Sequence, residues 1–193
     1  MTITYCVGDG LYINITNRCT NDCEFCIRKS SSSYGDADSL WLEREPSRDE
    51  ILSDIKNRNL SSFSEIVFCG FGEPTERLED LLWLCEQIKQ FCSLPIRVNT
   101  NGHASLIAGY DTAPLFANLV DRMNISLNAF DAEEYFRLCK PVFGEDTYLE
   151  MLDFAKRVKN YVPDVVLSIV AGTTDSELCQ KIADEVGLPL RIR

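Results

Sequence analysis

The chain has 193 residues, of which 45% are hydrophobic and 25% charged, and its formal net charge at pH 7 is −11. This length predicts one domain, residues 1–193, with a substantial core. The negative charge makes nucleic acid and anionic membranes unfavourable partners. No apolar run is long enough to span a bilayer, and Met1–Cys6 lacks the basic and apolar regions of a signal peptide, so we expect a cytoplasmic protein. Nine cysteines, an odd number, favour reduced thiols with some given to metal over a disulfide framework.

Taken in order, the chain alternates short apolar runs with segments of helical period. The expected strands are Thr2–Cys6, Leu11–Thr16, Glu65–Cys69, Pro95–Asn99, a strand marked by Met123, Ile125 and Leu127, Val165–Val170 and Leu188–Arg193. The expected helices begin after capping boxes at Ser47–Glu50, Asp131–Glu134 and Thr174–Glu177, run from Leu78 through Ile88 and from Thr147 to Asn160, and include a weaker helix at Thr112–Asn118.

From the strand Leu11–Thr16 onward, six strands alternate with helices, which predicts a parallel sheet. A complete eight-unit barrel takes about 250 residues. The chain therefore supports a partial (β/α)6 TIM-like barrel of the α/β class.

Three thiols, Cys19, Cys23 and Cys26, follow that first strand within eight residues, at the edge where parallel α/β folds bind their ligands. Thiolates this close can converge on zinc, copper(I) or an iron–sulfur cluster. Four ligands would close a structural zinc site or cap a four-iron cluster, whereas three leave one position open. A zinc knuckle or an unrelated Cys-rich loop is the alternative interpretation.

Two further motifs follow the next two strands and should lie at the same edge. The segment Gly70-Phe71-Gly72-Glu73-Pro74 combines glycines, which allow close backbone approach, with a carboxylate that can accept from an ammonium. Thr100-Asn101-Gly102 follows the strand after it and is also a common turn sequence.

Several single residues complete the candidate set. Asn99, Ser126 and Asn128 stand at the ends of adjacent strands and could hydrogen-bond a ribose or carboxylate. Lys140 could pair with an anion, although a solvated lysine is the simpler interpretation. His103 is interpreted as an ordinary loop residue, and the six other cysteines form no second group that predicts another cluster.

The Cys-x3-Cys-x2-Cys spacing, with Phe25 before the third cysteine, resembles the radical S-adenosylmethionine (radical SAM) superfamily. Gly70–Pro74 is similar to that family's Gly-Gly-Glu-Pro motif, from which Phe71 departs. Within the superfamily, Tyr12–Cys19 and the segment Ser126–Tyr135 look closest to the TatD family-associated radical SAM proteins.

The resemblance implies a [4Fe-4S] cluster held by three cysteines, with SAM bound through its amino and carboxylate groups on the fourth iron and a reductant such as flavodoxin or ferredoxin. The implied metal ligands are Cys19, Cys23 and Cys26. The implied SAM-binding residues are Gly70, Gly72, Glu73, Pro74, Asn99, Thr100, Asn101, Ser126, Asn128 and Lys140. Glu73 is expected to hold the SAM ammonium.

The substrate is open at this stage. A deoxyadenosyl radical must be shielded, and we expect the polar segment Arg28–Pro46 to cover the site, a flexible surface loop being the alternative. A six-unit barrel with a wide mouth favours a peptide or protein substrate, or a dimer partner, as part of the lid, with Arg191 and Arg193 clamping an anionic group. The alternatives are a small-molecule synthase like the one that makes 7-carboxy-7-deazaguanine, a glycyl-radical activating enzyme, and a zinc or electron-transfer module without SAM chemistry.

Overall fold

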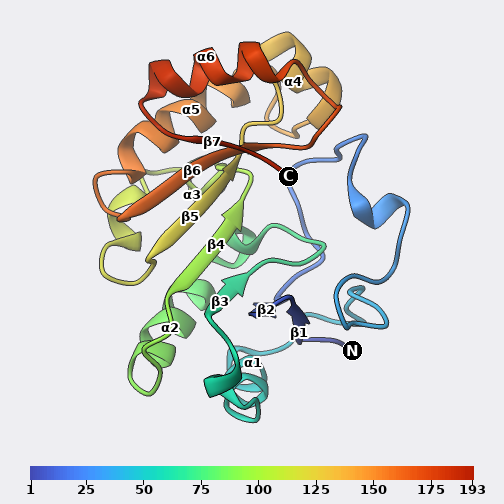
Figure 1. Ribbon diagram of the computed structural model, residues 1–193, viewed down its shortest axis with the longest axis vertical. Helices are drawn as coiled ribbons and strands as arrows, with labels where there is room; N and C mark the ends of the chain where they lie inside the picture. Colours follow the sequence, from blue (N-terminus) through green and yellow to red (C-terminus); the bar gives the residue numbers. More distant parts are fainter.

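The computed structural model describes residues 1–193, which form one seven-stranded sheet with helices packed along one side (Figure 1). The strands are β1 (Thr4–Val7), β2 (Gly10–Ile13), β3 (Glu65–Phe68), β4 (Ile96–Thr100), β5 (Arg122–Ser126), β6 (Asp164–Ile169) and β7 (Leu190–Ile192). They lie side by side in chain order, with β1 antiparallel to β2 and every later pair parallel. The prediction of six parallel strands in a partial barrel is confirmed.

Six α-helices and four 3₁₀ turns connect the strands. The helices are α1 (Arg48–Lys56), α2 (Leu78–Lys89), α3 (Ala104–Ala108), α4 (Ala132–Cys139), α5 (Thr147–Val158) and α6 (Ser176–Val186). The 3₁₀ turns are η1 (Ile27–Lys29), η2 (Leu60–Ser62), η3 (Pro74–Arg77) and η4 (Ala113–Phe116). None of the helices combines the length and apolar character needed to cross a membrane.

Helix starts follow the sequence closely, because capping side chains act locally. The Ser47 hydroxyl accepts from the backbone N–H of Glu50, and the backbone N–H of Ser47 donates to the Glu50 carboxylate, as the capping box predicts. Helix α6 corrects one prediction: its cap is Asp175, whose carboxylate accepts from two backbone N–H groups, while Thr174 bonds to Glu134 instead.

The region between β4 and β5 differs from the prediction. The expected helix at Thr112–Asn118 is only the 3₁₀ turn η4, and it ends before Asn118, which has a left-handed backbone with φ of 62°. The short helix α3 precedes it and was not predicted. It is only one turn and a half long, ends at Gly109, and has too few residues to show a period.

Alternation along the strands separates the core from the interior of the barrel. In β4, Ile96 and Val98 are buried against the helices, while the intervening Arg97 and Asn99 face the concave side. Each such apolar side chain contributes about 1.5–3 kcal/mol on burial. The concave side is polar. The barrel is open between β1 and β7, because these two strands do not pair.

Beyond η1, the segment Arg28–Pro46 contains no helix and no strand of the sheet, yet it is packed. Leu40 and Leu42 are buried, and their carbonyls accept from the side chains of Asn14 and Asn17, each at 2.7 Å. These contacts favour a packed cover beside the cysteine loop over a flexible surface loop.

Candidate functional site

Cys19, Cys23 and Cys26 lie in the loop that follows β2, at the carboxyl edge of the parallel strands. All three are free thiols and partly buried. No three His, Cys, Asp or Glu side chains are arranged as a ready metal-binding group. The fold thus brings the three thiols into one loop, where they do not converge on a single metal ion.

Backbone hydrogen bonds attach this loop to the end of α4. The amides of Asp22 and Glu24 donate to the carbonyls of Cys139 and Leu138, at 3.0 and 2.9 Å. Lys140, in a left-handed conformation with φ of 48°, ends α4 and forms an ion pair with Glu24 at 3.1 Å. Lys140 therefore lies at the cysteine loop and is engaged with a carboxylate there, and its pairing with an anionic ligand stays a prediction.

A buried polar network fixes the start of the loop. The Thr20 hydroxyl lies 2.8 Å from His103 Nδ1 and accepts from the Asn101 amide at 2.8 Å. The other ring nitrogen of His103 lies 2.9 Å from the Tyr135 hydroxyl, which accepts from Asn21. Each ring nitrogen of His103 therefore has a hydroxyl group within hydrogen-bond distance, so the buried ring is hydrogen-bonded on both sides. The interpretation of His103 as an ordinary loop residue is wrong.

Sequence reasoning also missed Cys139, because it stands far from the three clustered cysteines. Its buried thiol interacts with the thiol of Cys23, and this interaction lowers the pKa of Cys23 and raises that of Cys139. Burial raises the pKa of Cys19 to about 12. A metal would have to displace the proton of Cys19, as thiolate ligation requires.

The glycines of the second motif press against this same loop. A Cβ on Gly72 would lie 2.2 Å from the carbonyl oxygen of Thr16, and one on Gly70 would lie 2.1 Å from Asn14 Oδ1. Both glycines are therefore required for the turn after β3 to sit against the chain leaving β2. Phe71, the departure from the family motif, is buried and contacts Trp41 in the segment Arg28–Pro46.

Glu73 is buried, and donors within the chain occupy its carboxylate. Oε1 accepts from the Thr75 amide, the Thr75 hydroxyl and the Thr100 hydroxyl at 3.0, 2.8 and 2.7 Å, and Oε2 accepts from the Asn101 amide at 2.7 Å. Burial raises the pKa of Glu73, and these donors act against that rise. Glu73 thus ties η3, which begins at Pro74, to the end of β4. Its role in binding an ammonium stays a prediction.

The remaining candidates divide into two groups. Thr100 and Asn101 are buried and bonded to Glu73, Thr20 and His103. Asn99 and Asn128 have buried amide oxygens without a hydrogen-bond partner, and Ser126 accepts from Arg193 at 3.0 Å. Asn99 and Asn128 therefore offer hydrogen-bonding capacity that the chain itself does not use.

The donor set fits an iron–sulfur cluster. Three thiols from one loop supply soft ligands and leave one iron of a four-iron cluster without a protein ligand. The unpartnered amide oxygen of Asn128, a residue that is 3% exposed, belongs to the segment just after β5, at the same carboxyl edge of the sheet as the cysteine loop.

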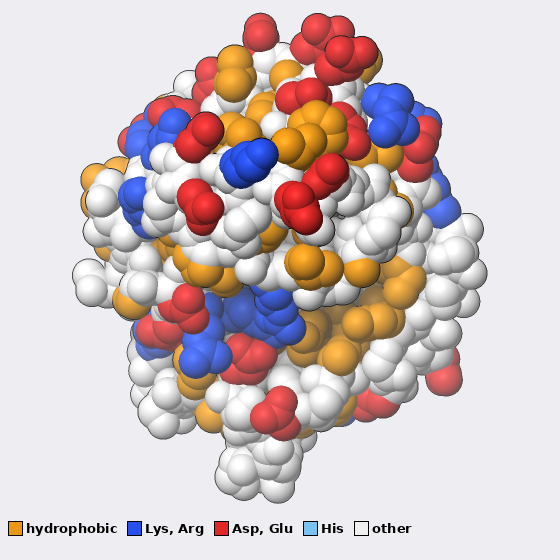
Figure 2. Space-filling model, turned by 45° about the horizontal axis from the view of Figure 1, so that its top comes forward, with side chains coloured by type: hydrophobic (Ala, Val, Ile, Leu, Met, Phe, Trp, Pro, Cys, Tyr) orange, Lys and Arg blue, Asp and Glu red, His pale blue; other side chains and the backbone are white.

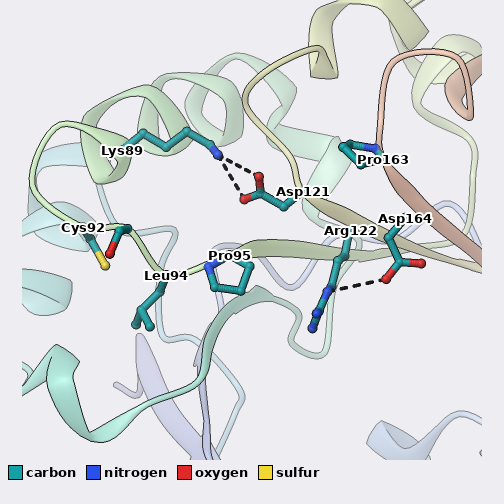
Figure 3. A pocket seen from close by; sticks show the side chains of 9 residues that line it. Lys89, Cys92, Leu94, Pro95, Asp121, Arg122, Pro163 and Asp164 are labelled. Atoms are coloured by element: carbon teal, nitrogen blue, oxygen red, sulfur yellow. Dashed lines mark hydrogen bonds and ion pairs between the residues drawn. The ribbon is translucent and has the colours of Figure 1, made fainter.

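A hollow of about 570 Å³ lies at the edge of the sheet opposite the cysteine loop, where β4, β5 and β6 begin (Figure 3). Lys89 contacts both carboxylate oxygens of Asp121 at 3.0 Å, and Arg122 pairs with Asp164 at 3.5 Å. Because these charged side chains pair with one another, they are not free to bind a charged ligand in this hollow.

Fold and site together define a partial-barrel protein with a three-cysteine loop at the ligand-binding edge. The family model described as the Radical SAM superfamily matches residues 13–185. The chain therefore belongs to the radical SAM superfamily, whose members are SAM-dependent enzymes that use a [4Fe-4S] cluster. The zinc-module alternative is wrong.

Among similar proteins, molybdenum cofactor biosynthesis protein 1 of Dictyostelium discoideum is 28% identical over 88% of this chain and 25% of its own length. The GTP 3',8-cyclase of Lactiplantibacillus plantarum is 30% identical over 68% of this chain and 37% of its own length. The chain thus spans well under two thirds of these relatives. Their names do not support the TatD-associated subgroup.

Solved structures show the same fold. Native anSMEcpe with bound AdoMet aligns with a TM-score of 0.62 at 19% identity, over 94% of this chain and 50% of that one. At this identity the likeness concerns the architecture alone, and it agrees with the partial barrel described above.

Proposed function

We propose that this chain is a radical SAM enzyme domain that holds a [4Fe-4S] cluster on Cys19, Cys23 and Cys26 and cleaves SAM reductively. When bound and reduced, the cluster supplies an electron that splits SAM into methionine and a 5'-deoxyadenosyl radical, which then takes a hydrogen atom from the substrate. The observation that carries the proposal is the match of residues 13–185 to the superfamily, with three free thiols at the ligand-binding edge.

The chain's own residues have separate tasks in this proposal. Thr20, His103 and Tyr135 hold the cysteine loop against α4, and Gly72 lets the turn after β3 approach it. Asn99 and Asn128 offer amide groups to the ribose or carboxylate of SAM. Glu73 joins the turn after β3 to the end of β4, and its contact with the SAM ammonium stays a prediction.

For the substrate, we propose a small molecule rather than the peptide or protein predicted from the open mouth. Relatives named GTP 3',8-cyclase favour this alternative. The polar concave side supports it as well, since the interior carries amide and guanidinium groups suited to a polar ligand.

The test is 5'-deoxyadenosine release from SAM by anaerobically purified protein reduced with dithionite. We expect release in the wild type and none when Cys19, Cys23 and Cys26 are all replaced by alanine. Cys92→Ser, at a cysteine outside the loop, is the matched control and should behave as the wild type. Equal release from the triple variant would refute the proposal.

A further inference from the structure

The concave interior of the barrel contains a cavity of about 300 Å³ that the cysteine loop and the predicted SAM residues do not account for. It reaches from β2 to β7, with Tyr12, Arg97, Asn124, Val166 and Arg191 among its lining residues. Figure 2 shows a hollow on one face in which Lys and Arg side chains gather on one wall and hydrophobic side chains on the other.

The charges in this cavity are unevenly paired. Glu65 pairs with Arg97 at 2.7 Å and with Arg122 at 3.5 Å, and Arg122 also pairs with Asp164. Arg191 has no hydrogen-bond or ion-pair partner, although it lines the cavity. The remaining carboxylate, Asp9, belongs to the β1–β2 turn at the far, amino-terminal edge of the sheet.

Arg193 adds a second guanidinium beside Arg191. The two residues are two positions apart on β7 and its end, so their side chains leave the same face of the strand. The Arg193 guanidinium donates only to the Ser126 hydroxyl, at 3.0 Å. Register places Arg191 opposite Ser168, and Ser168 opposite Ser126, at the carboxyl edge of the sheet. Two cations without carboxylate partners therefore stand at the edge that carries the cysteine loop.

A buried polar group deeper in the cavity points to a ligand independently. The Asn124 side chain lines the cavity, the residue is only 4% exposed, and its amide oxygen has no partner. Arg97 Nε, on the neighbouring strand, is likewise buried without an acceptor. Buried polar groups are ordinarily satisfied, so these two indicate a polar molecule that fills the space.

We propose that this interior binds a small phosphate-bearing molecule. Its phosphate pairs with Arg191 and Arg193, an N–H or O–H group donates to Asn124, and an acceptor meets Arg97 Nε. Phosphate is favoured over carboxylate because its three oxygens and higher charge can engage two guanidinium forks at once. This names the substrate class of the proposed enzyme and so rests on the proposed function.

The test uses inorganic pyrophosphate as the probe, titrated by calorimetry into the full chain, purified anaerobically, at fixed ionic strength. We expect one site per chain in the wild type, and a loss of about tenfold or more in affinity for Arg191→Gln and for Arg193→Gln, since each removes a charge-assisted contact. The affinity of the Arg191→Lys variant for pyrophosphate should lie between that of the glutamine variants and that of the wild type. Arg137→Gln, an exposed arginine on α4, is the matched control and should bind as the wild type.

Three outcomes would overturn this site: no saturable binding to the wild type, equal affinity in all variants, or tighter binding of succinate than of pyrophosphate. One-for-one displacement of pyrophosphate by SAM would also overturn it, because the arginines would then serve the SAM carboxylate. Iron content is measured on the same preparations. Iron-loaded protein that cleaves SAM without binding pyrophosphate contradicts this inference alone, whereas pyrophosphate binding without iron supports this site and contradicts the proposed function.

Discussion

Glu73, in the motif Gly70–Pro74, is hydrogen-bonded within the chain. Its two carboxylate oxygens already accept four hydrogen bonds, from Thr75, Thr100 and Asn101. Three of these bonds end on Oε1, so only Oε2, which accepts one, keeps a lone pair that an ammonium could use. The carboxylate is better understood as the group that joins the ends of β3 and β4, on which the surrounding site depends.

The variant Glu73→Gln tests this role. The glutamine oxygen can replace Oε1, but its NH2 group would face the backbone N–H of Asn101. Two buried hydrogen-bond donors would then face each other without an acceptor. We expect a loss of about 1–3 kcal/mol in the free energy of unfolding, measured by urea denaturation. Glu79→Gln, at an exposed glutamate of α2, should change it by less than about 0.5 kcal/mol. Unchanged stability combined with lost SAM binding would instead restore Glu73 as a direct ligand.

His103 predicts a pH dependence of stability. Burial lowers its pKa from 6.5 to about 3 in the folded chain, whereas the unfolded chain takes up a proton near pH 6.5. The unfolded state therefore binds more protons than the folded state between these two pH values. The contribution of His103 to the free energy of unfolding is fully present above pH 6.5 and falls by about 1.4 kcal/mol for each pH unit below it.

The measurement is urea unfolding between pH 7.5 and 5, compared with His103→Gln. We expect the wild type to lose about 2 kcal/mol more than the variant over this range. We expect the variant to be less stable than the wild type already at pH 7.5. The quantity compared is therefore the change of the unfolding free energy with pH. Parallel slopes would show that His103 is not held neutral by the fold.

At the scale of elements, the turn after β3 and the loop after β2 form one unit. The Glu73 amide donates to the Arg18 carbonyl at 2.7 Å, and Arg28 donates to the carbonyls of Asn17 and Phe71, each at 3.5 Å. These bonds require close approach of two backbones, which the glycines permit.

Gly72→Ala and Gly70→Ala form a matched pair for this unit. The new methyl group meets rigid backbone oxygen at position 72 but the Asn14 side chain at position 70, and a side chain can turn aside. Overpacking costs about 1–3 kcal/mol. We therefore expect the larger loss of unfolding free energy for Gly72→Ala, measured by denaturant titration. An equal or reversed order would contradict the described contact.

For the whole molecule, the alternation of apolar runs with helical segments predicts the six strands and the parallel sheet of a partial barrel, because strand period and capping are local properties. Cys139, the partners of Glu73 and the setting of His103 could not be predicted, since each depends on contacts between segments distant in sequence. The sequence singles out Arg191 and Arg193, whereas the place of the buried Asn124 in the same cavity as Arg191 depends on how the strands are arranged in the sheet.

The central claim is that three thiols of one loop hold a four-iron cluster. Its most direct test is the iron and sulfide content of anaerobically reconstituted chain. We predict about four irons and four sulfides per wild-type chain. The Cys19, Cys23 and Cys26 triple alanine variant should hold none, and Cys92→Ser should match the wild type. Retention of the full iron complement by the triple variant would contradict the account.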